Sequence, residues 1–153
     1  MTRMLALAGW ILLSFLAATI GGLAAPGQWY ERVNKPSWNP PNAVFAPVWT
    51  VLFILMGVAA WLVWLRRGET GVTLALALFV GQLVLNVLWS WLFFHWHRMD
   101  LAFYELLLFW VVILATLVAF WQVRPLAGWL FVPYLVWVTF AGYLNLTLWR
   151  LNR

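Results

Sequence analysis

Five long apolar stretches, at residues 4–25, 43–65, 72–94, 101–121 and 127–149, constrain this chain more than any other feature of its sequence. Each is as long as the roughly 20 residues that a helix needs to cross the hydrocarbon core of a bilayer. Only 8% of the 153 residues are charged, against about 25% in a soluble domain. The sequence therefore predicts an all-α integral membrane protein, a single domain over residues 1–153 built as a bundle of five transmembrane helices.

The first stretch follows Arg3 and ends in small residues, as a signal peptide does, but it is longer than the apolar core of about 7–15 residues in such peptides. We therefore interpret it as a spanning helix. Small residues four apart let two helix backbones approach closely. They predict contact with another helix, in this chain or in a homodimer, at Ser14, Ala18 and Gly22, at Ala17, Gly21 and Ala25, and at Ala77 and Gly81 in the third stretch.

Charge and cysteine content exclude several classes of function. The net charge is +5, but the longest basic run is Arg66-Arg67, so membrane lipid rather than nucleic acid is the expected partner. Lys and Arg divide four against five between the two ends of the bundle, so the positive-inside rule does not orient the chain. With no cysteine, disulfides, thiolate metal sites and Cys nucleophiles are excluded.

The longest connection, residues 26–42, precedes the second stretch and is rich in proline. It holds Trp38 and three helix-breaking prolines, Pro36, Pro40 and Pro41. Pro47 falls in the first turns of the next helix, where its missing donor costs little. Two interpretations stay open: a rigid loop that covers a pocket, and an interfacial turn with a Trp anchor.

Three of the predicted helices carry stripes that mix aromatic with small or amide residues at a spacing of four. Converging stripes would enclose a cavity with flat apolar walls and a few hydrogen-bonding groups, the usual make-up of a small-molecule site. The alternative is that the amides bond helix to helix and the aromatics are core. The stripes are Trp49, Phe53 and Gly57; Gln82, Asn86 and Ser90 with Trp89 beside them; and Pro133, Trp137, Ala141 and Asn145.

The remaining polar residues give no catalytic constellation. His95 and His97 are two residues apart at a helix end, so they do not share a helical face, and no metal site is predicted although ligation of haem stays an alternative. Glu105 is expected to snorkel or to pair with Arg98. The sequence holds no Walker loop, GxGxxG or Ser/His/Asp set, so hydrolysis and phosphoryl transfer are not predicted.

Several of these segments resemble the TspO/MBR family, which comprises the tryptophan-rich sensory proteins of bacteria and the mitochondrial translocator protein, once called the peripheral benzodiazepine receptor. The matching segments cover nearly the whole chain in the same order. They are WY at 29–30, KPSWNPP at 35–41, PVWTVLF at 47–53, LNVLWSWLFF at 85–94 and PYLVWVTFAGYLN at 133–145.

The resemblance implies a five-helix membrane bundle, often a homodimer, with a pocket that binds protoporphyrin IX or haem and hydrophobic drug-like molecules. No cofactor is expected to be required. Trp49 and Trp137 are the residues that the family would implicate in light-dependent breakdown of protoporphyrin, and they are expected to flank its ring. The ligand-binding set is expected to be Tyr30, Trp38, Trp49, Phe53, Asn86, Trp89, Ser90, Trp137, Ala141, Leu144 and Asn145.

Three functions remain open on the sequence: a tetrapyrrole-binding sensor or carrier, an enzyme-like photo-oxidase of protoporphyrin IX, and a transporter of lipid or sterol. The sterol motif of the animal proteins has a tyrosine where this chain has Leu146. Tyr143, the nearest tyrosine, lies too far from Arg150 for that motif. This departure disfavours a sterol and fits a multi-pass protein of a bacterial cell membrane rather than a mitochondrial one.

Overall fold

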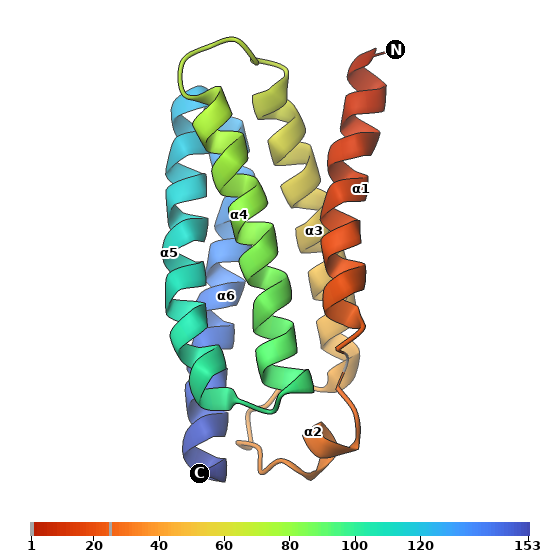
Figure 1. The fold of residues 1–153 in the computed structure, drawn as a ribbon, viewed down its shortest axis with the longest axis vertical. Helices are drawn as coiled ribbons and strands as arrows, with labels where there is room; N and C mark the ends of the chain where they lie inside the picture. Colours follow the sequence, from red (N-terminus) through yellow and green to blue (C-terminus); the bar gives the residue numbers. More distant parts are fainter. Residues whose placement is uncertain (1, 25) are drawn as a thin grey trace.

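The computed structural model describes residues 2–24 and 26–153 and is helical throughout (Figure 1). Five helices are long and apolar enough to cross a membrane, which confirms the predicted fold class. The elements are α1 (Thr2–Gly22), the short α2 (Gln28–Arg32), α3 (Asn42–Trp64), α4 (Val72–Ser90), the π-helical turn η1 (Trp91–His95), α5 (Met99–Val123) and α6 (Pro125–Asn152).

The helix ends differ from the predicted ones because helices continue into polar residues that an apolar pattern does not include. α6 begins at Pro125 rather than at 127, since proline at the first helical position loses no intrahelical hydrogen bond. α1 ends at Gly22, and Ala25 lies outside the described residues. The short α2 falls within the connection 26–42, ahead of Pro36, Pro40 and Pro41, and was not predicted.

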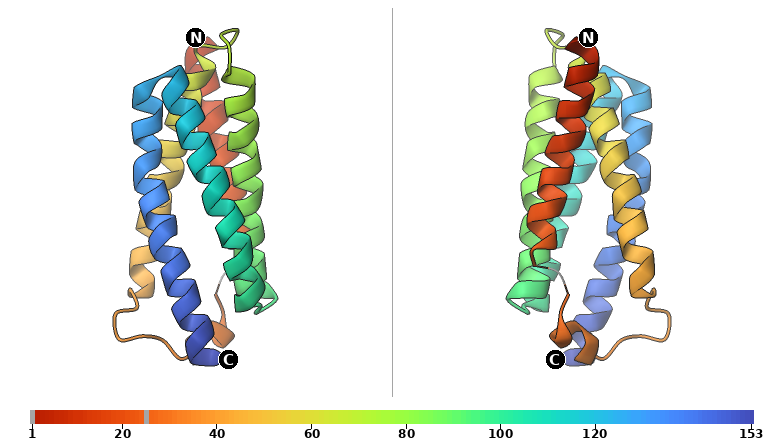
Figure 2. Two further views of the ribbon diagram at one scale, coloured as in Figure 1. Left: turned by 90° about the vertical axis from the view of Figure 1, so that its left-hand side faces the viewer. Right: turned by 90° about the vertical axis from the view of Figure 1, so that its right-hand side faces the viewer.

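The five long helices form a closed ring in the order α1, α3, α6, α5 and α4, in which each helix packs against the next and α4 returns to α1. Figures 1 and 2 show the two described ends of the chain at opposite ends of the bundle, as an odd number of spans requires. The α2 segment crosses the end at which the C-terminus lies. We call this end the C-terminal face and the other the N-terminal face.

Large aromatic side chains fill the half of the ring near the N-terminal face. Phe79, Phe120 and Phe131 are fully buried there, with ring centroids 5.1–6.1 Å apart. Farther along, Gly57 permits the close contact of α1 with α3, since an added Cβ would stand 2.8 Å from the Cα of Ile11. Toward the C-terminal face this core gives way to a cavity.

Candidate functional site

A cavity of about 530 Å³ lies in the half of the bundle next to the C-terminal face. Its volume is within the range of about 300–1,000 Å³ that is usual for small-molecule sites. Its walls come from the C-terminal halves of α1, α4 and α6, from the N-terminal half of α3, and from η1. Tyr30 of α2 and Pro26 contribute from the connection that crosses this end of the bundle.

Ten of the eleven residues predicted to bind ligand lie together in this wall. The stripes of α3, α4 and α6 therefore converge, although the outer member of each stripe, Gly57, Gln82 or Pro133, lies outside the cavity lining. The ten residues are Tyr30, Trp49, Phe53, Asn86, Trp89, Ser90, Trp137, Ala141, Leu144 and Asn145.

Trp38 is the predicted residue that does not line the cavity. Its indole stacks on Tyr143 at a ring-centroid distance of 5.4 Å and meets Phe140 edge-on at 6.0 Å. Tyr143 is on the outward surface of α6, and both aromatic side chains are largely exposed. The proline-rich loop thus places its tryptophan against the outside of α6, as an anchor would lie, while Tyr30 is the aromatic residue that faces the cavity.

Several lining residues were not predicted. Three of them, Phe45, Phe93 and Phe94, continue the predicted stripes by one more step of four residues, from Trp49, Trp89 and Ser90, and that signal would have found them. The others come from α1, α3, α6 and Pro26, and the small residues of α1 were interpreted only as a helix-packing surface. Those on α1 are Phe15, Ala18, Thr19, Gly21 and Gly22.

Trp49 and Trp137 meet as a corner rather than as two parallel walls. Their ring centroids are 6.4 Å apart and their planes are at 89°. No flat ring fits between them in this arrangement, and that both flank a bound ligand stays a prediction. A planar ligand can lie against the face of one indole and meet the edge of the other, a geometry that aromatic rings favour.

The hydrogen-bonding groups of the wall divide into paired and unpaired ones. The Trp89 indole donates to the Asn145 side-chain oxygen at 3.0 Å, and the Asn145 amide donates to the Met99 carbonyl. The Asn86 amide donates to the Tyr134 hydroxyl at 2.9 Å, and that hydroxyl donates to Gln82. The amides therefore do join helix to helix, and they do so inside the cavity wall.

The Trp137 indole nitrogen is the exception. It is buried and has no hydrogen-bond partner among residues 2–24 and 26–153. A buried donor without an acceptor costs about 1–3 kcal/mol. An acceptor on a bound molecule would remove that cost.

The α2 segment is fixed by contacts at its C-terminal end. The Lys35 ammonium donates to the Tyr30 carbonyl at 2.6 Å and to the Val33 carbonyl at 3.2 Å, which satisfies acceptors at the end of α2. The Asn152 side chain donates to the Asn34 carbonyl and accepts from the Asn34 N–H, both at 2.8 Å. Burial raises the pKa of the Tyr30 hydroxyl above its ordinary value, so this wall group stays neutral at physiological pH.

The two histidines and Glu105 lie away from the cavity lining. His97 stacks on Trp29, His95 contacts Trp91, and within the described part of the chain no group of three His, Cys, Asp or Glu side chains is placed to hold a metal ion. The prediction that Glu105 pairs with Arg98 is wrong. Arg98 instead makes a bidentate pair with Asp100, with both distances 3.0 Å. The Glu105 oxygens are buried and have no hydrogen-bond partner in residues 2–24 and 26–153.

These features define a class of protein: a multi-pass, all-helical membrane protein with an aromatic ligand cavity under a proline-rich connection. The chain belongs to the TspO/MBR family, whose sequence profile it matches over residues 10–150.

Relatives of the chain occur in bacteria and in animals. It is 44% identical over 147 residues to the tryptophan-rich sensory protein of Cereibacter sphaeroides, an alignment that covers 93% of this chain and 91% of the relative. It is 43% identical to protein CrtK of Rhodobacter capsulatus, over 89% and 86% of the two chains. It is 40% identical to the translocator protein of Homo sapiens, over 94% and 88%.

Proposed function

We propose that the cavity binds a planar tetrapyrrole, protoporphyrin IX or haem, and that the protein acts as a sensor or carrier of that pigment in the membrane. The observation that carries the proposal is the lining: about 530 Å³ enclosed largely by aromatic side chains from α3, α4, η1 and α6. Flat conjugated ligands gain dispersion and hydrophobic free energy from such walls.

Two polar groups of the wall favour a planar ligand that has hydrogen-bond acceptors at its edge. The Trp137 N–H is a buried donor that needs an acceptor. The Tyr30 hydroxyl, which burial keeps protonated, is a second donor in the wall. Tyr30 belongs to α2 at the C-terminal face, whereas Trp137 is the lining residue of α6 farthest from the end of that helix. Acceptors at the edge of a porphyrin, such as its propionate carboxylates, would pair with these donors.

The test is a titration of the purified protein with protoporphyrin IX in nanodiscs, followed by tryptophan fluorescence and by the Soret band of the porphyrin. Wild-type protein should show quenching and a red-shifted Soret band. Ala141→Phe places a large ring inside the cavity, so it should weaken binding at least tenfold, about 1.4 kcal/mol. Ala8→Phe, the matched control, adds the same ring at an exposed position of α1 that does not line the cavity.

Unchanged fluorescence and an unshifted Soret band with the wild-type protein would contradict the proposal. Equal loss of binding in the two alanine variants would show that the titration reports bilayer partitioning rather than occupancy of the cavity. Both variants are first compared by their thermal unfolding, so that a misfolded protein is recognised as such.

A second candidate function, light- and oxygen-dependent breakdown of bound protoporphyrin IX, rests on a specific observation. Two indoles, Trp49 and Trp137, both line the cavity and touch each other edge to face. Indole is the most easily oxidised side chain in this wall. An excited porphyrin held against it can pass its energy to oxygen or take an electron from the ring.

We also propose a homodimer in a bacterial cell membrane as the working form. The bacterial and the mammalian relatives match at similar identity, so the membrane is proposed from Leu146, which replaces the tyrosine of the animal sterol motif. The dimer is proposed from the outward small residues Ala77 and Gly81 of α4, where close backbone packing is possible.

A further inference from the structure

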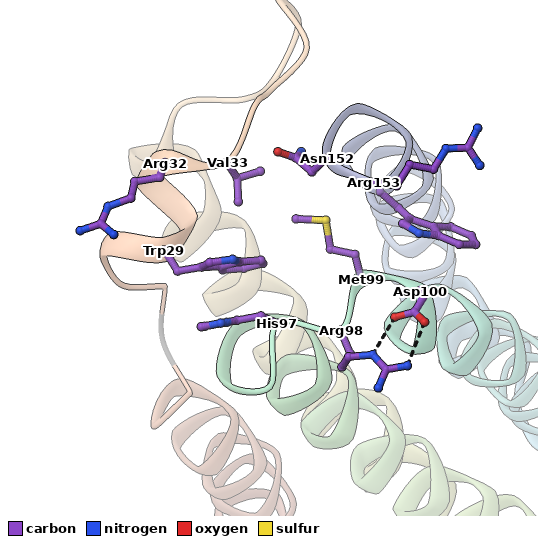
Figure 3. A pocket seen from close by; sticks show the side chains of 10 residues that line it. Trp29, Arg32, Val33, His97, Arg98, Met99, Asp100, Asn152 and Arg153 are labelled. Carbon is purple, nitrogen blue, oxygen red and sulfur yellow. Dashed lines mark hydrogen bonds and ion pairs between the residues drawn. The ribbon is translucent and has the colours of Figure 1, made fainter.

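A second hollow of about 410 Å³ lies at the C-terminal face (Figure 3), where it is lined by Trp29 of α2, whereas the neighbouring Tyr30 lines the cavity. It opens between α2, the turn from η1 into α5, and the last turn of α6. It shares no lining residue with the cavity. Ten residues line it: Trp29, Arg32, Val33, His97, Arg98, Met99, Asp100, Trp149, Asn152 and Arg153.

The lining side chains carry three guanidinium groups and one carboxylate. The carboxylate, Asp100, is used by Arg98, which holds it through two hydrogen bonds of 3.0 Å. Within residues 2–24 and 26–153, neither Arg32 nor Arg153 forms an ion pair with a carboxylate; Arg32 donates only to the neutral Gln28 amide at 3.3 Å. Glu31 is exposed beside Arg32 and does not line the hollow. Two cations are therefore left for an anion from outside the chain.

In Figure 3, Arg32 and Arg153 lie on opposite sides of the hollow, with Val33 and Met99 between them, and their guanidinium groups point outward, away from each other. Val33 and Met99 are buried and form the floor, while the indoles of Trp29 and Trp149 form the sides. An occupant that satisfies this lining has a negative group for the arginines and an apolar part beside it. A small hydrated anion would leave the floor unused.

The walls of the hollow are built rigidly. The Trp29 indole and the His97 ring stack in parallel, with centroids 4.1 Å apart and planes at 8°. His97 has a φ of 57°, in the left-handed region that residues with a Cβ rarely adopt. Asn152, in the opposite wall, is fixed by its two hydrogen bonds to Asn34. Backbone strain held by surrounding contacts is characteristic of ligand clamps.

The hollow also lies at the right depth for a lipid headgroup. It is formed by residues at the ends of membrane-spanning helices, where the apolar segments finish. Tryptophan at this level is typical of the membrane–water interface, and arginine there attracts anionic lipid. We propose that this hollow binds the headgroup of an anionic phospholipid, whose negative charge is attracted by Arg32 from one side and by Arg153 from the other, with the upper part of the acyl chains against Val33 and Met99.

The experiment compares lipids retained by the full chain in nanodiscs of phosphatidylcholine mixed with phosphatidylglycerol, counted by native mass spectrometry. Wild-type protein should retain phosphatidylglycerol preferentially. In the double variant Arg32→Gln/Arg153→Gln, the ratio of retained phosphatidylglycerol to phosphatidylcholine should fall about fivefold for each arginine removed. The matched control is Arg3→Gln/Arg67→Gln, which removes the same charge from exposed positions at the N-terminal face. Circular dichroism melts establish that both variants fold.

Three results would overturn the proposal. Equal loss in the control variant would mean that net charge, not this hollow, selects the lipid. Equal retention of both lipids by the wild-type protein would mean that the hollow does not select an anionic headgroup. The third result concerns inorganic phosphate and lipid-free protein. If phosphate binds as tightly as phosphatidylglycerol, and binds the double variant equally well, the two arginines do not recognise the headgroup.

Discussion

Two tryptophans of the cavity wall differ in one respect that single substitutions can measure: whether the indole N–H has an acceptor. Trp89 donates to Asn145, whereas Trp137 has no partner in the described residues. Replacement by phenylalanine removes the N–H and a similar volume at both positions, so the difference between the two variants isolates the hydrogen bond.

We expect Trp89→Phe to lower the free energy of unfolding by about 1–3 kcal/mol, because it leaves the Asn145 oxygen buried and unpaired. Trp137→Phe should lower the free energy of unfolding by about 1–3 kcal/mol less than Trp89→Phe does, because it removes a donor that is already unsatisfied. Unfolding in detergent without ligand, followed by circular dichroism, gives both values. A Trp137→Phe variant less stable than Trp89→Phe would mean that its N–H has an acceptor in the folded protein.

The photochemical role of Trp49 and Trp137 is tested by the double variant Trp49→Phe/Trp137→Phe. Phenylalanine keeps a flat apolar surface, so binding of protoporphyrin IX should weaken by about 1 kcal/mol or less for each lost hydrogen bond. Loss of porphyrin absorbance under light and oxygen should fall sharply, because the oxidisable indoles are gone. Samples kept in the dark are the control, and breakdown at the wild-type rate with pigment still bound would mean ordinary photobleaching.

At the residue scale the sequence predicted which side chains gather but not how they are turned. The spacing of four placed Asn86, Ala141 and the two tryptophans in one wall, since helical geometry alone determines which residues share a face. It did not predict the 89° between Trp49 and Trp137, which depends on side-chain packing between different helices. Trp38 was misplaced because a loop has no periodicity from which direction could be deduced.

At the scale of elements, one side chain of α6 attaches the connection over the cavity to the end of that helix. Asn152 holds Asn34 through two hydrogen bonds, much as a neighbouring strand would. Asn152→Ala removes both, so amide hydrogen exchange in residues 34–42 should accelerate by about tenfold or more, the equivalent of two bonds of about 1 kcal/mol each. A bound porphyrin should dissociate faster as well.

Thr147→Ala is the matched control for that experiment. The Thr147 hydroxyl also lies near the end of α6, but it donates only to the Tyr143 carbonyl of its own helix. Exchange in the connection should be unaffected by this change. Acceleration of the same size in both variants would mean that fraying of α6, rather than the tie between Asn152 and Asn34, controls the connection.

α2 itself could not be predicted. It has five residues, too few for a hydrophobic period to be recognised, and helices of this length are not stable alone. Its stability comes from the Lys35 ammonium on its last carbonyls and from the packing of Trp29 and Tyr30 on Phe93. The contacts with Phe93 join segments more than sixty residues apart, and the sequence gives no indication of them.

At the scale of the whole molecule, length and apolarity predicted five spans, but the order of the helices around the ring did not follow from them. In water, an apolar face reveals which side of a helix is inside. Here the outer surface is apolar too: Leu12, Leu74, Val111 and Val136 are each more than half exposed. The inside and the lipid side therefore look alike in the sequence, and the neighbours of each helix remain undetermined.

The assembly of two copies is predicted to depend on α4. A Cβ added at Gly81 meets no atom within 4 Å, and Ala77 one turn earlier is exposed. Gly81→Leu should therefore leave the fold intact and weaken the homodimer, as cross-linking and light scattering in detergent would show. Gly22→Leu is less informative, because Gly22 lines the cavity.

Gly9→Leu serves as the control for the dimer experiment, since Gly9 is equally open but lies on α1 outside the small-residue surfaces named above. It should remain dimeric. A Gly81→Leu protein that is still fully dimeric would place the interface on a different helix.

Trp29 and Tyr30, neighbours on one short helix, belong to different chambers: the first faces the arginine-rimmed hollow and the second faces the aromatic cavity. Helix α2 therefore separates the two proposed binding sites. A shift of α2 that enlarges the hollow or the cavity would change the shape of the other. If a ligand at one site alters the affinity of the other site, the second ligand must alter the affinity of the first by the same factor. The composition of the surrounding bilayer would then be one of the variables that sets how firmly the pigment is held.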